Sequence, residues 1–328
     1  MKKRLSLQLL ATAGALAIGL LGSATVQAQQ KLKWAHVYET SEPYHTESVW
    51  AADEIKKRSN GKFEIQVFPA STLGKETDIN QGLTLGTVDM IISGPSFAAR
   101  AYPRFGIAYY PFIFRDGDHL LAYSKSPVFQ EMVNEFRAKT GIQVTAYTYH
   151  GARHTTAQKA FTNCDGMKGI KIRVPDVPAY RATPEACGAN PTPIAFAEVY
   201  LALQNGTVDA QENPLTTIEA KKFYEVQKAI MLTGHIVDGL TTQIAPHVWN
   251  KLSDAEKKMF TEVTQQAAVR ASAQIKKREA ELVDEFKKKG LQIVAVDRKS
   301  FQDAVLKNKP LESLGFTRAD YDKIQAAK

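Results

Sequence analysis

Apolar and polar positions alternate between strand-like and helix-like patterns in the first third of the chain. Apolar residues at every second position or in short runs predict strands at 31–37, 62–68 and 87–93. Amphipathic segments between them predict helices at 43–59 and 75–86, the first of which is stopped by an Asn-Gly pair. Because strands separated by helices need crossover connections, this order predicts an α/β fold with a mainly parallel sheet.

The same alternation restarts further along and continues to the end of the chain. Further strands are predicted at 141–151, 169–175, 207–210, 226–237, 240–246 and 291–296. Further helices are predicted at 119–139, 196–206, 214–223 and 253–289. Asp176 is a candidate N-cap for another helix, with Pro178 in its first turn.

A short internal similarity suggests two α/β units of like construction. The runs "LTLGTVDM" and "LALQNGTVDA" share a helix end, a glycine able to adopt the left-handed conformation, and a strand that starts Thr-Val-Asp. Each strand leads into a loop, "SGPS" in the first unit and "QENP" in the second. Ligands of open α/β sheets bind beyond the carboxyl ends of strands, so two such loops facing each other would frame a cleft.

No low-complexity linker separates these units, so ordered strands or the long helix must join them. We expect residues 29–150 to form mainly a first lobe and residues 151–240 mainly a second. Residues 241–328 would then supply the long helix and C-terminal elements that pack on both lobes.

The first residues, "MKKRLSLQLLATAGALAIGLLGSATVQA", have the basic, apolar and small-residue regions of a secretory signal, which predicts a signal peptide at 1–28. A membrane anchor is the alternative, but the apolar region is short for a span and no cysteine follows it for lipidation. Export of a soluble protein is therefore expected. The formal charge of +8 falls to +5 once Lys2, Lys3 and Arg4 are removed, and this mild excess argues against a nucleic-acid partner.

Cys164 and Cys187 are the two cysteines of the chain. In an oxidising exported compartment such a pair favours a disulfide over two free thiols, and its spacing matches no zinc site. A bridge would tie the segment before the strand at 169–175 to the end of the helix that follows it. That would stiffen the backbone around Arg173.

The strand "GIKIRVP" has aliphatic residues on one side and the cations Lys171 and Arg173 on the other. A half-solvated edge strand explains this pattern simply. The alternative is that Arg173 binds an anion, because a guanidinium presents a rigid fork of donors that matches a carboxylate.

The motifs of common catalytic and metal sites are incomplete in this sequence. "SGPSF" lacks the second glycine of a nucleophile elbow. "PASTLGKET" has Pro69 and Glu76 where a phosphate loop needs its first glycine and its Ser or Thr. His150 and His154 are four residues apart, but in a strand-like segment, which argues against a metal site.

Four polar residues at predicted strand ends and loops remain: Arg153, Arg173, Glu212 and Asn213. Asn213 precedes a proline and could simply begin a turn and cap the next helix. Two arginines in consecutive strand segments are harder to explain by structure alone, because buried cations are costly without partners. An anionic ligand would supply the partner.

The runs "DGMKGIKIRVPDVPAY" and "GANPTPIAFAEVYLALQNGTVDAQENP" resemble the solute-binding proteins of TRAP (tripartite ATP-independent periplasmic) transporters. The likeness extends over essentially the whole chain after residue 28. It implies an α/β fold of two lobes, joined by strands and a long helix, that closes on an organic acid without a cofactor. The loaded protein would present the acid to a sodium-driven permease made of a small and a large membrane subunit.

The resemblance also implies roles for individual residues. Arg173 would form a salt bridge with the ligand carboxylate, Arg153 would be the second ligand arginine, and Asn213 and Phe196 would contact the ligand. In the first lobe, the positions that contact the distal part of the ligand are His36, Glu76 and Gly94 to Ser96. Here "HVYETSEPYH" and "SGPS" differ from the sialic-acid binders of the family.

These first-lobe candidates include no permanent cation, and a carboxylate such as Glu76 accepts hydrogen bonds from hydroxyls while repelling a second acid. A hexuronate such as glucuronate or galacturonate is therefore the favoured ligand. C4-dicarboxylates or short hydroxy acids are the alternative. An exported sugar-acid hydrolase or lyase, with His36, Glu76 or His235 as acid and base, is a weaker one because no paired-carboxylate or nucleophile motif can be assigned. Glu212 and His235 complete the set of candidate site residues.

Overall fold

Strands and helices form close to the positions that the hydrophobic pattern predicts. The computed structural model describes residues 29–328; the predicted signal peptide at 1–28 lies outside the described residues. The strands are β1 (Gln30–Ala35), β2 (Phe63–Phe68), β3 (Met90–Ser93), β4 (Gln143–Ala157), β5 (Lys171–Val174), β6 (Asn190–Pro193), β7 (Ala210–Pro214), β8 (Ala229–Ile244) and β9 (Gln292–Val294). The helices are α1 (Pro43–Arg58), α2 (Glu76–Leu85), α3 (Pro95–Ala98), α4 (Gly117–Ser124), α5 (Pro127–Thr140), α6 (Ala182–Ala186), α7 (Val199–Gln204), α8 (Leu215–Ala220), α9 (Pro246–Trp249), α10 (Asp254–Lys288), α11 (Arg298–Asn308) and α12 (Arg318–Gln325).

The strands join into one nine-stranded mixed sheet in the order β2-β1-β3-β8-β4-β7-β5-β6, with β9 paired to β8. β1 is parallel to β2 and β3, and β5 is parallel to β6 and β7. The central pair β4–β8 is antiparallel, as are its junctions to β3 and β7. The expected parallel pairing therefore holds within each end of the sheet and fails at its centre.

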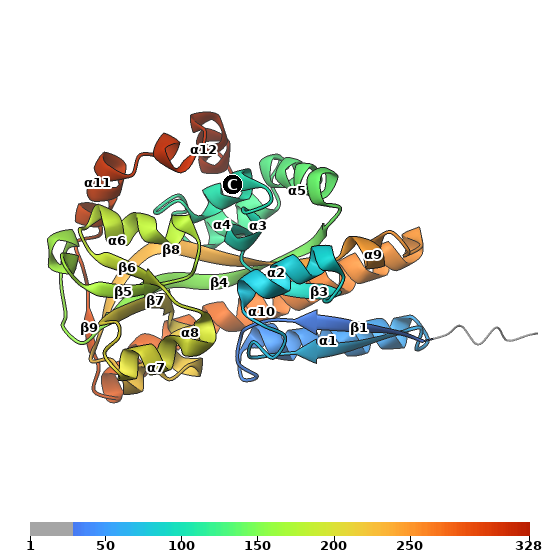
Figure 1. Cartoon of the computed structure of the whole chain (residues 1–328), viewed down its shortest axis with the longest axis horizontal. Coiled ribbons are helices and arrows are strands. Elements are labelled where there is room, and N and C mark those ends of the chain that lie inside the picture. The colour runs from blue at the N-terminus through green and yellow to red at the C-terminus, as the bar shows by residue number, and fades with distance from the viewer. Residues whose placement is uncertain (1–28) are drawn as a thin grey trace, which may run out of the picture.

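Figure 1 shows β1, β2, β3, α1 and α2 gathered at one end of the sheet and β5, β6, β7, α7 and α8 at the other. We call these ends the β1–β3 half and the β5–β7 half. The long strands β4 and β8 belong to both halves, and α10 packs against α1 in one half and α8 in the other. Ordered strands and the long helix thus join two lobes, as the sequence predicts, although the exact lobe boundaries stay a prediction.

Several predicted elements differ from the structure. The "QENP" segment expected as a loop after a strand at 207–210 lies within β7. The helix expected at 119–139 is two helices, because Ser126 accepts a hydrogen bond as the N-cap of α5 and Pro127 occupies the first helical position. The two strands expected at 226–237 and 240–246 are the single strand β8 of 16 residues. Asp176 does not cap a helix; its carboxylate pairs with Arg100 instead.

β5 lies between β6 and β7 in the sheet, so it is an interior strand and the edge-strand explanation is wrong. Lys171 is exposed, whereas only 1% of Arg173 is exposed. The polar side of β5 therefore carries one solvated cation and one buried cation, and only the buried one needs a partner within the protein or a ligand.

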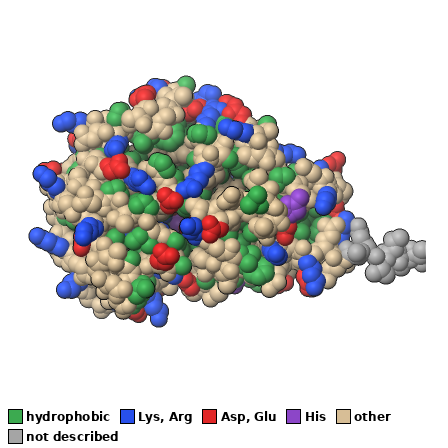
Figure 2. Space-filling model, in the orientation of Figure 1, with side chains coloured by type: hydrophobic (Ala, Val, Ile, Leu, Met, Phe, Trp, Pro, Cys, Tyr) green, Lys and Arg blue, Asp and Glu red, His purple; other side chains and the backbone are tan. Residues whose placement is uncertain are grey.

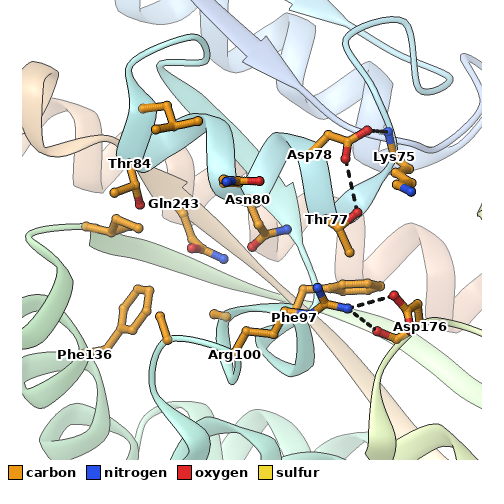
Figure 3. Close-up of a pocket in the computed structure, with 15 residues that line it drawn as sticks. Lys75, Thr77, Asp78, Asn80, Thr84, Phe97, Arg100, Phe136, Asp176 and Gln243 are labelled. Atoms are coloured by element: carbon orange, nitrogen blue, oxygen red, sulfur yellow. Dashed lines mark hydrogen bonds and ion pairs between the residues drawn. The ribbon is translucent and has the colours of Figure 1, made fainter.

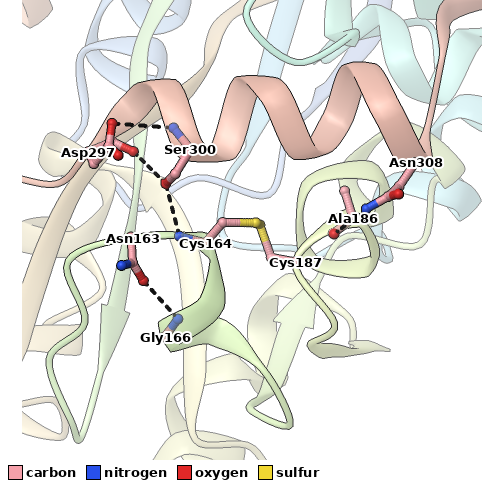
Figure 4. The surroundings of a disulfide bond; sticks show 8 residues. All are labelled: Asn163, Cys164, Gly166, Ala186, Cys187, Asp297, Ser300 and Asn308. Atoms are coloured by element: carbon pink, nitrogen blue, oxygen red, sulfur yellow. Dashed lines mark hydrogen bonds between the residues drawn. A yellow bond between two sulfur atoms is a disulfide. The ribbon is translucent and has the colours of Figure 1, made fainter.

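The disulfide between Cys164 and Cys187 is present, with Cα atoms 5.0 Å apart. Cys164 precedes β5 and Cys187 ends α6, so the bridge spans the strand that carries Arg173. Figure 4 shows α11 alongside it, where Ser300 accepts a hydrogen bond from the Cys164 amide and Asn308 donates to the carbonyl of Ala186. Among residues 29–328, no helix is both long and apolar enough to cross a membrane.

Candidate ligand-binding site

Arg173 is buried on β5, yet most of its guanidinium is uncommitted. Its Nε donates to the carbonyl of Ile194 at 2.9 Å, and its Cζ lies 5.9 Å from the centre of the Phe196 ring. No residue in the described range accepts a hydrogen bond from its two terminal nitrogens. Burial lowers the pKa of Arg173 to about 10, while Glu76 opposes this effect, so the group is charged at neutral pH.

A cavity of about 370 Å³ opens onto this guanidinium. Arg173 and Glu76 both line it, which places the predicted carboxylate clamp and the predicted hydroxyl acceptor on the same space. Burial raises the pKa of Glu76, although the charges of Arg173 and Arg153 act in the opposite direction. Lys75, which is exposed, lines the outer part of the same cavity.

Arg153 is also buried, but it is surrounded by acceptors. Nε and Nη2 donate to the Glu212 carboxylate, Nη2 also reaches Asn213 Oδ1 at 3.1 Å, and Nη1 donates to Asp238 Oδ2 at 2.7 Å. Its guanidinium lies 4.8 Å from the centre of the Tyr180 ring. Because a guanidinium has five N–H groups, little more than one N–H of Nη1 remains for another acceptor.

The contacts of Arg153 continue into a buried polar group. Glu212 and Asn213 accept hydrogen bonds from Arg153, and His235 lies next to Glu212. Burial alone would raise the pKa of Glu212, but Arg153 and His235 keep it below its ordinary value. His235 Nε2 is 3.3 Å from Glu212 Oε2. The Asn213 amide donates to Gln211 Oε1 at 2.6 Å, which leaves one N–H of that amide free.

The candidates of the β1–β3 half approach the same region from the other side. His36 is buried, its Nε2 lies 3.2 Å from His45 Nδ1, and burial lowers its pKa to about 3, so it is neutral. Ser96 donates to the Tyr180 hydroxyl at 3.4 Å, and Tyr180 in turn contacts Arg153. A Cβ on Gly94 would lie 2.7 Å from the hydroxyl oxygen of Tyr109, so a larger residue here would require the buried Tyr109 side chain to shift.

The structure adds aromatic and acidic residues that the sequence analysis missed. Tyr38 lies between the two halves, with its ring 6.1 Å from those of both His36 and Phe196. Tyr180 lies within the family motif "KIRVPDVPAY", but the sequence pattern does not mark it as a site residue. Asp238 was detectable in principle, because a lone carboxylate inside the apolar strand β8 must have a buried partner.

The cleft is partly closed at its entrance by charged residues. Arg100 of the β1–β3 half donates to Asp176 of the β5–β7 half at 2.8 Å. A second, larger cavity of about 620 Å³ lies next to this pair, between α2 and α3, with Asn80, Phe97 and Gln243 among its lining (Figure 3). Basic and acidic side chains are mixed over the face of the molecule in Figure 2, without an extended area of one sign.

The family model described as bacterial extracellular solute-binding protein, family 7, matches residues 34–311. The sialic acid-binding periplasmic protein SiaP of Vibrio cholerae is 33% identical to this chain over 87% of it and 89% of that protein. This chain therefore belongs to family 7 of the bacterial extracellular solute-binding proteins. It is a TRAP solute-binding protein, and the family and its structural neighbours are solute-binding proteins, not enzymes.

Solved structures of the family have the same two-lobed fold. A TRAP periplasmic solute-binding protein from Polaromonas sp. JS666, bound to D-erythronate, superposes with a TM-score of 0.87 at 32% identity, covering 92% of this chain and 99% of that one. One from Xanthobacter autotrophicus Py2, bound to β-D-galacturonate, has a TM-score of 0.85 at 26% identity, covering 90% and 100%. This chain is therefore a solute-binding protein with the same fold as these organic-acid-bound neighbours.

Proposed function

We propose that this TRAP solute-binding protein captures a polyhydroxylated monocarboxylate in the periplasm, with a hexuronate such as glucuronate or galacturonate as the first candidate. The observation that carries the proposal is the buried guanidinium of Arg173, whose terminal nitrogens face a cavity without a protein acceptor in the described chain. A ligand carboxylate would take both nitrogens and supply the missing counter-charge. Arg153, Asn213 and Phe196 would complete this end of the site.

The opposite wall of the site supports a hydroxylated ligand. Glu76 lines the same cavity as Arg173 and can accept hydrogen bonds from hydroxyls. His36 is neutral, so it offers no positive charge to a second carboxylate. The ligands named for the three relatives, sialic acid, D-erythronate and β-D-galacturonate, are all hydroxylated monoacids.

A C4-dicarboxylate is the alternative ligand, and one observation favours it. Lys75 is exposed at the outer end of the cavity that holds Arg173, so an extended diacid could place one carboxylate on each cation. Such a ligand would pass Glu76, whose carboxylate would repel it when ionised.

Delivery to a membrane permease completes the proposed function. The family partner is a sodium-driven permease with a small and a large membrane subunit, and the predicted signal peptide at 1–28 would bring this chain to the same compartment. Capture by two lobes that close over the acid suits this role, because the loaded and empty forms then present different surfaces to the partner.

A thermal-unfolding panel tests the ligand class. Refolded, ligand-free protein is mixed with D-glucuronate, D-galacturonate, D-erythronate, succinate or malate, and the midpoint of unfolding is measured. A ligand at 100 times its dissociation constant stabilises the folded state by about 2.7 kcal/mol, which raises the midpoint by several degrees. Shifts with hydroxylated monoacids alone support the proposal; a shift with succinate alone supports the dicarboxylate alternative.

A further inference from the structure

A hydrogen bond between two buried side chains crosses from one half of the molecule to the other. Glu42 precedes α1 in the β1–β3 half and is 2% exposed, and Thr217 lies on α8 in the β5–β7 half and is fully buried. The Thr217 hydroxyl donates to Glu42 Oε1 at 2.9 Å. Neither residue lines the cavity that holds Arg173, so this contact lies outside the candidate site.

The hydrogen bonds continue from Thr217 to the ligand arginine. His150 Nε2 is 3.3 Å from Thr217 Oγ1, and His150 Nδ1 is 3.0 Å from Asp238 Oδ2. The same Asp238 oxygen accepts from Arg153 Nη1 at 2.7 Å. We call the path Glu42–Thr217–His150–Asp238–Arg153 the interlobe chain.

His150 and Asp238 lie on the two strands that belong to both halves. The register of β4 against β8 shifts between Tyr149 and Gly151, so His150 occupies an irregularity where the pair can bend. The rings of Tyr38 and Tyr44 pack edge-on against the imidazole, and the Tyr44 hydroxyl donates to the His150 carbonyl. The interlobe chain therefore passes through the connection about which the lobes would move.

The surroundings of Glu42 allow both its ionised and its protonated form near neutral pH. Burial raises the pKa of Glu42 to about 7, the backbone amide of Glu39 and the Thr217 hydroxyl lower it, and the charges of Glu39 and Lys221 have small opposing effects. At the other end, burial would raise the pKa of Asp238, but His150 and Arg153 hold it at about 2. In the interlobe chain, Asp238 is therefore ionised at neutral pH, and Glu42 is a group that titrates near neutral pH.

We propose that Glu42 and Thr217 are positioning residues that couple lobe closure to the orientation of Arg153. When the halves meet, Thr217 gains its partner Glu42 just before α1, and the interlobe chain holds Asp238 and Arg153 in the geometry described above. When they separate, Thr217 and His150 lose that partner. The inference rests on the proposed function only in taking Arg153 as a ligand arginine.

The ligand-free protein gives the first test, by long-range ¹H–¹⁵N NMR of its histidine imidazoles. Thr217→Val removes the hydroxyl with little change of shape, and we expect the His150 Nε2 resonance to shift markedly. Thr217→Ser keeps the hydroxyl and should restore the wild-type position. Thr183→Val is the matched control, because Thr183 is buried in the same half and its hydroxyl has no partner within residues 29–328. An unmoved His150 signal in Thr217→Val would overturn the proposal.

Binding kinetics give the second test, with D-galacturonate or D-erythronate as the probe. Loss of the interlobe hydrogen bonds in Thr217→Val should speed dissociation about tenfold and leave association within about twofold, because these bonds stabilise the closed arrangement of the two halves. Glu42→Gln keeps an oxygen that can accept from Thr217 but cannot ionise. It should therefore keep the contact and remove the change in dissociation rate that ionisation of Glu42 causes around pH 7. Equal effects of Thr183→Val and Thr217→Val would contradict the coupling. If neither probe binds, the ligand proposal fails, while the NMR result still decides the interlobe chain.

Discussion

At the scale of the residue, two buried arginines have opposite surroundings. Arg153 donates to two carboxylates and an amide oxygen, so its charge is compensated within the protein. Arg173 donates to one backbone carbonyl and faces a cavity. A buried cation without a counter-charge is costly, and a ligand carboxylate removes that cost on binding. The protein itself therefore compensates the charge of Arg153, whereas the terminal nitrogens of Arg173 are available to a ligand carboxylate.

Arg173→Lys should weaken binding of the acid chosen by the thermal panel at least 30-fold, because a lysine ammonium cannot reproduce the two parallel hydrogen bonds. The unfolding midpoint of the ligand-free variant should match or exceed that of the wild type, since the clamp has no carboxylate in direct contact. Lys171→Ala, an exposed cation on the same strand, is the control and should change affinity less than twofold. Isothermal titration calorimetry measures both; wild-type affinity in Arg173→Lys would remove the clamp assignment.

At the scale of the element, the short strand β5 depends on its flanks. A strand of four residues carries the clamp, and the disulfide joins the segments on either side of it. α11 adds hydrogen bonds at both ends of the bridge, where Ser300 accepts from the Cys164 amide and Asn308 donates to the carbonyl of Ala186, next to Cys187. The rigid placement of Arg173 therefore comes from cross-links around β5 and from its neighbours in the sheet, more than from the strand itself.

Replacing Cys164 and Cys187 by serine should lower the free energy of unfolding by about 3 kcal/mol, the chain-entropy value for a loop closed over 23 residues. Urea unfolding of the oxidised wild type and of the double variant measures the difference. Reduction of the wild type with dithiothreitol should reproduce it. A difference below about 1 kcal/mol in both comparisons would show that the bridge contributes little beyond the packing of α11.

At the scale of the whole molecule, the two halves meet through buried and exposed contacts of different kinds. Thr217 with Glu42 is a buried hydrogen bond, whereas Arg100 with Asp176 is an ion pair with both side chains more than half exposed. An exposed pair contributes little to stability and is screened by salt. Closure should therefore depend mainly on the buried contacts and on the ligand.

The free energy of unfolding should depend on pH because His36 is neutral in the folded protein. Its folded pKa of about 3 lies below the unfolded value of 6.5, so unfolding takes up a proton between these limits and stability is lost as the pH falls through them. Relative to His36→Gln, the wild type should lose about 1.4 kcal/mol per pH unit between pH 6 and pH 4. Urea unfolding at several pH values measures this slope; parallel curves for the two proteins would contradict it.

Local patterns predicted most elements because the period of apolar residues reports which side of a segment is buried. The long helix α10 illustrates this: Ser253 and Glu256 form the capping box at its start, and the apolar positions recur on one side. The pattern predicted the wrong boundaries where one or two residues decide whether a helix or strand ends. The Ser126–Pro127 start of α5 splits a predicted helix, and Gly239 lies inside β8 where a break was expected.

The sequence by itself determined the α/β alternation, the disulfide pair and, through its motifs, the TRAP family and the candidates Arg153 and Arg173. Only the tertiary structure decided that β5 is an interior strand, that Arg153 is compensated by Asp238 while Arg173 is open, and that Glu42 meets Thr217. The physical reason is that local periodicity depends on neighbouring residues, whereas the cost of a buried charge depends on which distant groups the fold brings within hydrogen-bonding distance.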